Sequence, residues 1–224
     1  GRMTCGRRLS YSDIAEAVGA FNAERIDKKT FIEIENKSCP TCGSCSGMFT
    51  ANSMNCLSEV LGMALPGNGT IPAVMSARYR LAKEAGMKVM DLVRADLKPR
   101  DIMTREAFEN ALAVDMALGC STNSMLHLPA IAHEYGIELD CDMFDRMHRG
   151  ARWLLDGRPA GRWPAAYVWY AGGVPRVMER LRDLLHLDVL TVTGRTLGEN
   201  LDELRRNGYY EKCAAYLDAF NRRY

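Results

Sequence analysis

The sequence predicts a soluble α/β fold that is built mostly from helices. Amphipathic helical patterns fill most of the 224 residues, and only residues 187–192 have the character of a β-strand. Hydrophobic residues make up 47% of the chain and charged residues 25%, which excludes a disordered or collagen-like chain. Lysine and arginine total 29 against 28 acidic residues, so a nucleic-acid or anionic membrane surface is not expected as a partner.

The N-terminal residues predict two short helices followed by a loop. A capping pattern at residues 10–13 opens an amphipathic helix over residues 10–24. A second capping pattern begins at Thr30, and its helix must end before Pro40 because a residue that precedes proline is excluded from the helical region. The loop that follows contains three closely spaced cysteines: Cys39, Cys42 and Cys45.

The next helix begins directly after these cysteines. Apolar residues recur at three- and four-residue spacing over residues 54–64, and the turn residues at 66–69 end the pattern. The cysteines therefore lie at the N-terminal end of a helix. Unpaired N–H groups and the positive end of the helix dipole favour a thiolate or a negatively charged cluster there.

Three further helices are expected in the middle of the chain. Pro72 suits the first position of a long helix that continues to Leu92, and Thr104 caps a helix that is apolar nearly all round and includes Asp115. A buried carboxylate such as Asp115 must find a partner. The small polar loop at residues 119–123 can either receive a ligand or cap the helix that extends to Tyr135.

The C-terminal third is less regular. Residues 153–169 are aromatic and broken by prolines, and residues 171–175 predict a turn into a helix that continues through Leu185. The apolar run at 187–192 predicts the strand. From Thr193 onward the chain is polar and has no clear apolar stripe over most of its length.

The cysteine cluster alone leaves two interpretations open. Its Cys-x2-Cys-x2-Cys spacing is similar to a bacterial ferredoxin run, but Phe49 stands where the next cysteine would be expected. A zinc site would also need a fourth ligand, and the remaining Cys and His residues are isolated. The cluster is therefore either part of a metal or iron-sulfur site or a set of small buried thiols in a tight loop.

Residues 39–57 read Cys-Pro-Thr-Cys-Gly-Ser-Cys-Ser-Gly-Met-Phe-Thr-Ala-Asn-Ser-Met-Asn-Cys-Leu. This stretch resembles the third cysteine motif of the dihydroxy-acid dehydratases, a family that includes 6-phosphogluconate and sugar-acid dehydratases. Further blocks that match the family in order lie at residues 61–70, 107–111, 119–128, 171–175 and 191–200. Residues 158–169 depart from the family pattern.

The resemblance implies that the chain is an internal segment of the family's N-terminal domain. Residues 1–200 would form the helix-rich part of a three-layer αβα domain that carries the iron-sulfur site. Residues 201–224 would be a linker region that leads towards a C-terminal β-barrel-like domain, which is absent from this chain.

The resemblance also implies a cofactor. An iron-sulfur cluster is held by three cysteines from three separate motifs, and the only one of these in this chain is Cys45, as cofactor and metal ligand. The cluster type, 2Fe-2S or 4Fe-4S, stays open. The Mg²⁺ ligands and the serine base would lie outside this segment, so no catalytic residue is assigned within it.

The implied function is that of a hydro-lyase. It would remove water from 2,3-dihydroxy-3-methyl acids to give branched 2-keto acids for valine, isoleucine and leucine synthesis, as a cytoplasmic homodimer with a small dihydroxy acid as its substrate. Dehydration of an aldonate or of 6-phosphogluconate is the second interpretation. A small metal-binding or electron-transfer module that uses all three clustered thiols is the third. We expect the segment alone to be inactive and poorly stable, because its helices would expose apolar faces.

Overall fold

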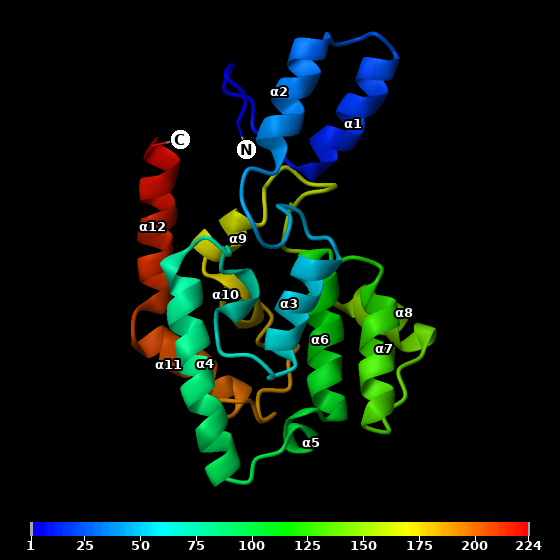
Figure 1. Ribbon diagram of the computed structural model, residues 1–224. Helices are drawn as coiled ribbons and strands as arrows, with labels where there is room; N and C mark the ends of the chain where they lie inside the picture. The colour runs from blue at the N-terminus through cyan, green and yellow to red at the C-terminus, as the bar shows by residue number, and fades with distance from the viewer. Residues whose placement is uncertain (1, 224) are drawn as a thin grey trace.

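The structure is a computed structural model that describes residues 2–223, and their regular secondary structure consists of helices joined by turns and loops (Figure 1). No sheet forms among residues 2–223, and the β-pairing given for them consists of three isolated bridges. The prediction of a helix-rich chain is therefore confirmed, whereas the three-layer αβα arrangement is not confirmed.

The strand predicted at residues 187–192 is wrong. Leu190 makes one antiparallel bridge with Thr196, and the chain turns back on itself between them. The Val192 N–H donates to the Gly62 carbonyl at 2.8 Å, so this segment is held at the edge of the core by single backbone bonds. Val189 and Val192 are buried and Leu187 and Leu190 are half-buried against the core, and burial alone does not distinguish a strand from an extended loop.

The first two helices form a hairpin that projects from the rest of the molecule (Figure 1). The hairpin consists of α1 (Tyr11–Asn22) and α2 (Lys28–Ser38), which pack on each other around Leu9, Ala17 and Ile34. The capping box predicted for α1 is present, since the Ser10 N–H donates to Asp13 at 2.7 Å. Helix α2 begins earlier than predicted, because Asp27 and not Thr30 caps it.

The main core surrounds α3 (Thr50–Val60) and α6 (Arg105–Leu118), which pack against each other and against α10 (Gly173–Arg180). As predicted, α6 is buried on most sides. The largest fully buried side chains of this core include Phe108, Leu57, Leu112, Leu128 and Leu181. The remaining elements are η1 (Asn68–Thr70), α4 (Ser76–Arg94), α5 (Pro99–Ile102), α7 (Ser124–Glu134), α8 (Cys141–Gly150), α9 (Ala166–Tyr170), α11 (Leu197–Arg206) and α12 (Tyr209–Arg223).

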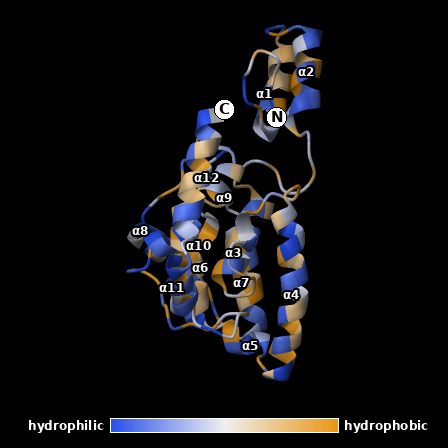
Figure 2. Ribbon diagram, turned by 90° about the vertical axis from the view of Figure 1, so that its left-hand side faces the viewer, coloured by the Kyte–Doolittle hydropathy of each residue, from blue (hydrophilic) through white to orange (hydrophobic). Residues whose placement is uncertain are grey.

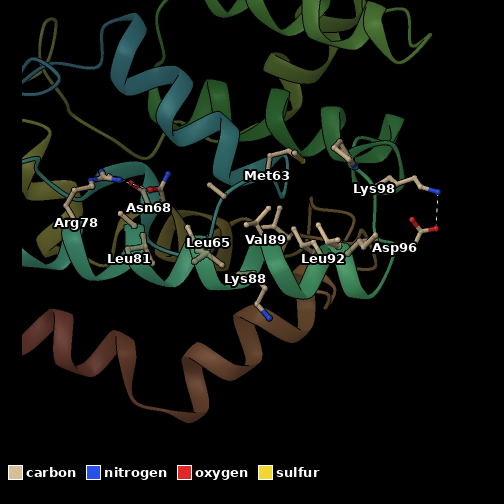
Figure 3. A pocket seen from close by; sticks show the side chains of 17 residues that line it. Met63, Leu65, Asn68, Arg78, Leu81, Lys88, Val89, Leu92, Asp96 and Lys98 are labelled. Carbon is tan, nitrogen blue, oxygen red and sulfur yellow. Dashed lines mark hydrogen bonds and ion pairs between the residues drawn. The ribbon is translucent and has the colours of Figure 1, made fainter.

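Helix α4 is long but contributes no buried residue to the core. It lies along one side of the molecule (Figures 1 and 2), and its apolar residues border a groove of about 730 Å³. Figure 3 shows Leu81, Val89 and Leu92 of α4 facing Met63 and Leu65 across this groove. Helix α4 is thus a loosely attached element with an apolar surface of its own.

Residues 197–223 carry two helices that the polar sequence did not reveal. The first, α11, is capped by Thr196, which accepts the Glu199 N–H. The second, α12, packs against α9, where the Tyr216 ring lies 5.3 Å from the ring of Tyr170. Within residues 2–223, no helix combines the length and apolar composition that crossing a bilayer requires.

Candidate functional site

The candidate site is centred on the loop of residues 39–49, which joins α2 to α3 and which we call the cysteine loop. Cys45 lies in it with partial exposure, five positions before the first residue of α3. The predicted placement of the cysteines before a helix is confirmed for Cys45, whereas Cys39 lies at the C-terminal end of α2. The Phe49 side chain makes no capping bond, so the first N–H groups of α3 gain no partner from that residue.

Two segments from elsewhere hold the cysteine loop. The Met48 N–H donates to the Arg158 carbonyl at 2.6 Å, and the Ala165 N–H donates to the Ser46 carbonyl at 2.7 Å. From α3, the Asn52 side chain donates to the carbonyls of Cys45 and Gly47 at 2.6 Å each. Residues 158–165 belong to the stretch that departs from the family pattern, so the structure assigns this stretch a local contact with the cysteine loop.

Two glycines let the cysteine loop approach its neighbours closely. Gly43 has a φ of +96°, and a Cβ there would come within 2.5 Å of the Ala73 side chain. A Cβ on Gly47 would come within 2.8 Å of the Phe49 ring and 3.1 Å of the Arg158 carbonyl oxygen. A side chain at either position would therefore displace the cysteine loop.

The polar loop at residues 119–123 lies against the same end of α3. The Ser121 N–H donates to Ser53 Oγ at 2.9 Å, and Ser53 in turn donates to the Met48 carbonyl at 3.2 Å. The Asn123 side chain donates to Thr50 Oγ1 at 2.5 Å and makes no capping bond to α7. The structure thus brings the two predicted loops together at the start of α3.

Two other thiols lie deeper in the molecule. Burial raises the pKa of Cys56, and the nearby Glu59 carboxylate adds to this effect. Burial also raises the pKa of Cys120, with the neighbouring Asp115 as the next cause. Both thiols are therefore held in the protonated form, which is a poor metal ligand.

Asp115 lies fully buried in α6, as the sequence predicts. His148 Nε2 of α8 lies 3.1 Å from Asp115 Oδ2, which is within ion-pair distance, but the two atoms do not have hydrogen-bond geometry. The other carboxylate oxygen, Oδ1, is also buried without a hydrogen-bond partner. His148 could not have been identified from the sequence, because it lies far from Asp115 along the chain and only the packing of α8 on α6 brings the two together.

The three clustered cysteines do not form a common metal site. Cys39 and Cys42 are exposed, and within residues 2–223 no group of three or more His, Cys, Asp or Glu residues is placed to hold a metal ion. The module that uses all three thiols therefore gains no support. Cys45 fits a cluster as one ligand, because its thiol is accessible and its Sγ has only a weak contact, 3.5 Å from the Gly47 carbonyl oxygen.

The sequence of the chain, which includes the cysteine loop, matches the N-terminal domain of a class of dehydratases. The family model described as "Dihydroxy-acid/6-phosphogluconate dehydratase N-terminal" matches residues 1–200, and the chain belongs to this family. The family resemblance noted in the sequence is therefore confirmed.

Similar proteins carry the name dihydroxy-acid dehydratase. The one from Acetivibrio thermocellus is 55% identical over 205 residues, which is 91% of this chain and 37% of that protein. The one from Ruminiclostridium cellulolyticum is 55% identical over 206 residues, with the same coverage of both chains. The one from Clostridium kluyveri is 57% identical over 198 residues, which is 88% of this chain and 36% of that protein. The chain thus spans little more than a third of the length of these relatives.

Proposed function

We propose that this chain is the cysteine-loop segment of a hydro-lyase that dehydrates 2,3-dihydroxy-3-methyl acids to branched 2-keto acids, in the synthesis of valine, isoleucine and leucine. The observation that carries the proposal is the cysteine loop, which lies within the residues that match the dehydratase family and presents Cys45, partly exposed, five positions before the start of α3. The names of the relatives, dihydroxy-acid dehydratase, support this substrate class.

Cys45 is the residue that we propose as one ligand of an iron-sulfur cluster. Such a cluster, when bound, supplies a Lewis-acidic iron that stabilises the oxygen leaving from C3 of the substrate. The residues of this chain hold the thiol. Asn52 and the backbone of residues 158–165 fix the cysteine loop, and the loop at residues 119–123 packs beside it. The cluster type, the Mg²⁺ ion, the homodimer and the cytoplasmic location stay predictions from the family resemblance.

The experiment is a segment exchange. The chain would replace the matching 205 residues of the Acetivibrio thermocellus relative, and the chimera would be reconstituted anaerobically with iron and sulfide. We expect dehydration of dihydroxyisovalerate and an iron-sulfur absorption band. We also expect the isolated chain to show no turnover.

Cysteine variants of the chimera separate the possible cluster ligands. Cys45→Ser should lose the absorption band, while the double variant Cys39→Ser, Cys42→Ser should keep it. If the double variant lost the band as completely as Cys45→Ser, Cys45 would not be the single ligand of this segment.

A sugar-acid dehydratase is the second candidate, because the family model also covers 6-phosphogluconate dehydratases. The same chimera decides between the two when it is assayed with 6-phosphogluconate and an aldonate. Turnover of these acids without turnover of dihydroxyisovalerate would overturn the first candidate.

A further inference from the structure

Asn52 lies in the first turn of α3, and its side chain reaches back over the cysteine loop. Its carboxamide nitrogen donates to the Cys45 carbonyl and to the Gly47 carbonyl, at 2.6 Å each. Both partners are acceptors only, so the NH2 end of the amide must face them. The orientation of Asn52 is therefore determined by its two contacts.

These contacts converge beside the thiol of Cys45. The Gly47 carbonyl oxygen that accepts from Asn52 also lies 3.5 Å from Cys45 Sγ. The amide thus holds the two carbonyls on either side of Ser46 at one point and sets the direction in which the thiol leaves the backbone. Because Asn52 belongs to a helix whose following turns are packed in the core, the cysteine loop inherits the rigidity of α3.

The contacts that residues 158–165 make with the cysteine loop are of a different kind. Residues 158–165 reach it through backbone groups alone, at Met48 and Ser46. A change of side chain in that stretch leaves those bonds possible. Asn52 is the residue whose side chain makes a direct bond to the Cys45 backbone.

We propose that Asn52 is a positioning residue for Cys45, whose carboxamide holds the thiol in the direction that a metal cluster requires. The inference rests on the proposed role of Cys45 as a cluster ligand. Its test uses the metal-free chain and measures the cysteine loop directly. The inference can therefore fail while Cys45 remains a ligand in the chimera, and the reverse can also occur.

The experiment is pulsed alkylation of the reduced chain with iodoacetamide, with each cysteine quantified by mass spectrometry. Three other cysteines serve as internal references. Cys39 and Cys42 are exposed and report the activity of the reagent. Cys56 is fully buried in the core and reports global unfolding.

The variants are Asn52→Ala, which removes the amide, and Asn52→Asp, which keeps the shape but cannot donate when ionised. The matched control is Asn55→Ala. Asn55 lies on the same helix and also bonds the cysteine loop, donating to Ser44 Oγ at 3.1 Å, but it does not bond Cys45.

We expect both Asn52 variants to raise the labelling of Cys45 relative to Cys39 by roughly five- to tenfold, the effect of losing one to two net hydrogen bonds. Cys56 should stay protected, and Asn55→Ala should match the wild type. A purely structural role would expose Cys45 and Cys56 together. The proposal is overturned if Cys45 labelling stays unchanged in the Asn52 variants, if it rises only in step with Cys56, or if Asn55→Ala produces the same increase.

Discussion

Glu59 is a fully buried acid whose carboxylate accepts two backbone N–H groups. Gly67 and Gly69, at the turn that begins η1, each donate to it at 2.6 Å. Burial raises the pKa of Glu59 to about 7, against the opposing effect of these two bonds and of Arg78. Ionisation of Glu59 therefore disfavours the folded state, because the unfolded chain holds this acid at a lower pKa.

The raised pKa of Glu59 makes the stability of the fold depend on pH. The stabilising contribution of Glu59 is fully present below its unfolded pKa of about 4.5 and is lost as the pH rises through about 7. The loss is on the order of 3 kcal/mol. We expect the free energy of unfolding of Glu59→Gln to depend less on pH between 5 and 8 than that of the wild type, as measured by urea denaturation. Glu84→Gln on the exposed face of α4 is the control, and equal pH slopes for Glu59→Gln and the wild type would contradict this expectation.

The cysteines differ in burial, which their spacing in the sequence does not reveal. Their spacing alone favoured a metal site and left a tight thiol loop open, and the family resemblance selected Cys45. The structure adds that Cys56 and Cys120 are kept protonated by burial, which is a property of the packed core. No spacing rule reports burial, so this distinction could not be made from the sequence.

At the scale of elements, α6 and α8 are joined by the Asp115–His148 contact. His148 Nε2 lies 3.1 Å from Asp115 Oδ2, and the His148 ring packs edge-on against Phe144 within α8. We predict that His148→Ala lowers the free energy of unfolding by about 1–3 kcal/mol, because it removes the close polar contact of a buried carboxylate and the packing of the ring on Phe144. Urea denaturation at pH 7 measures the change. His133→Ala on an exposed face of α7 should change stability by less than about 0.5 kcal/mol, and equal losses for the two variants would refute the contact's role.

Substitutions on helix α4 should have little effect on stability, because its apolar residues are not buried. Val93 is 69% exposed, so Val93→Lys should change the free energy of unfolding by less than about 0.5 kcal/mol. Leu57→Ala, in the fully buried core, should lower it by about 2–5 kcal/mol. We also expect Val93→Lys to reduce self-association of the isolated chain in sedimentation experiments. A large stability loss for Val93→Lys would show that α4 is packed more tightly than described.

The whole molecule consists of a main core and a projecting hairpin with its own small core. The hairpin is joined to the body by Asp13, whose Oδ2 lies 3.5 Å from Arg158 Nη1, and by a hydrogen bond from Arg8 to Tyr167. Because Arg158 also holds the cysteine loop through its carbonyl, the hairpin and the candidate site share one support.

This arrangement predicts that Arg158→Ala loosens the hairpin without unfolding the core. Limited proteolysis within residues 39–49 should become about three- to tenfold faster, since loss of one partly buried ion pair weakens the attachment by on the order of 1 kcal/mol. The thermal midpoint of the core should stay nearly constant. Arg162→Ala removes an exposed pair with Asp156 and should leave proteolysis unchanged. Equal rates for wild type and Arg158→Ala would remove the support for this coupling.

Strong helical patterns in the sequence predict that a helix is present more reliably than they predict the residues at which it begins and ends. The helices around residues 10–24 and 104–118 are present as α1 and α6, because capping residues and apolar periodicity agree there. The long helix begins at Ser76 and not at Pro72, and α10 ends at Arg180 and not at Leu185. No helix was predicted at α8, α11 or α12, because charged residues interrupt the short apolar faces of these helices. Helix α8 packs on α6, and α12 packs on α9 and α11.

The sequence by itself determined the helical character of the chain, the position of Cys45 before a helix and membership of the dehydratase family. These properties depend on local periodicity, on capping chemistry and on the order of residues along the chain. Only the tertiary structure decided that residues 158–165 and Asn52 hold the cysteine loop, that the loop at 119–123 lies against the start of α3, and that residues 187–192 form no strand. The physical reason is that each of these contacts uses at least one backbone group. Every sequence carries such groups alike, and only the fold decides which of them meet.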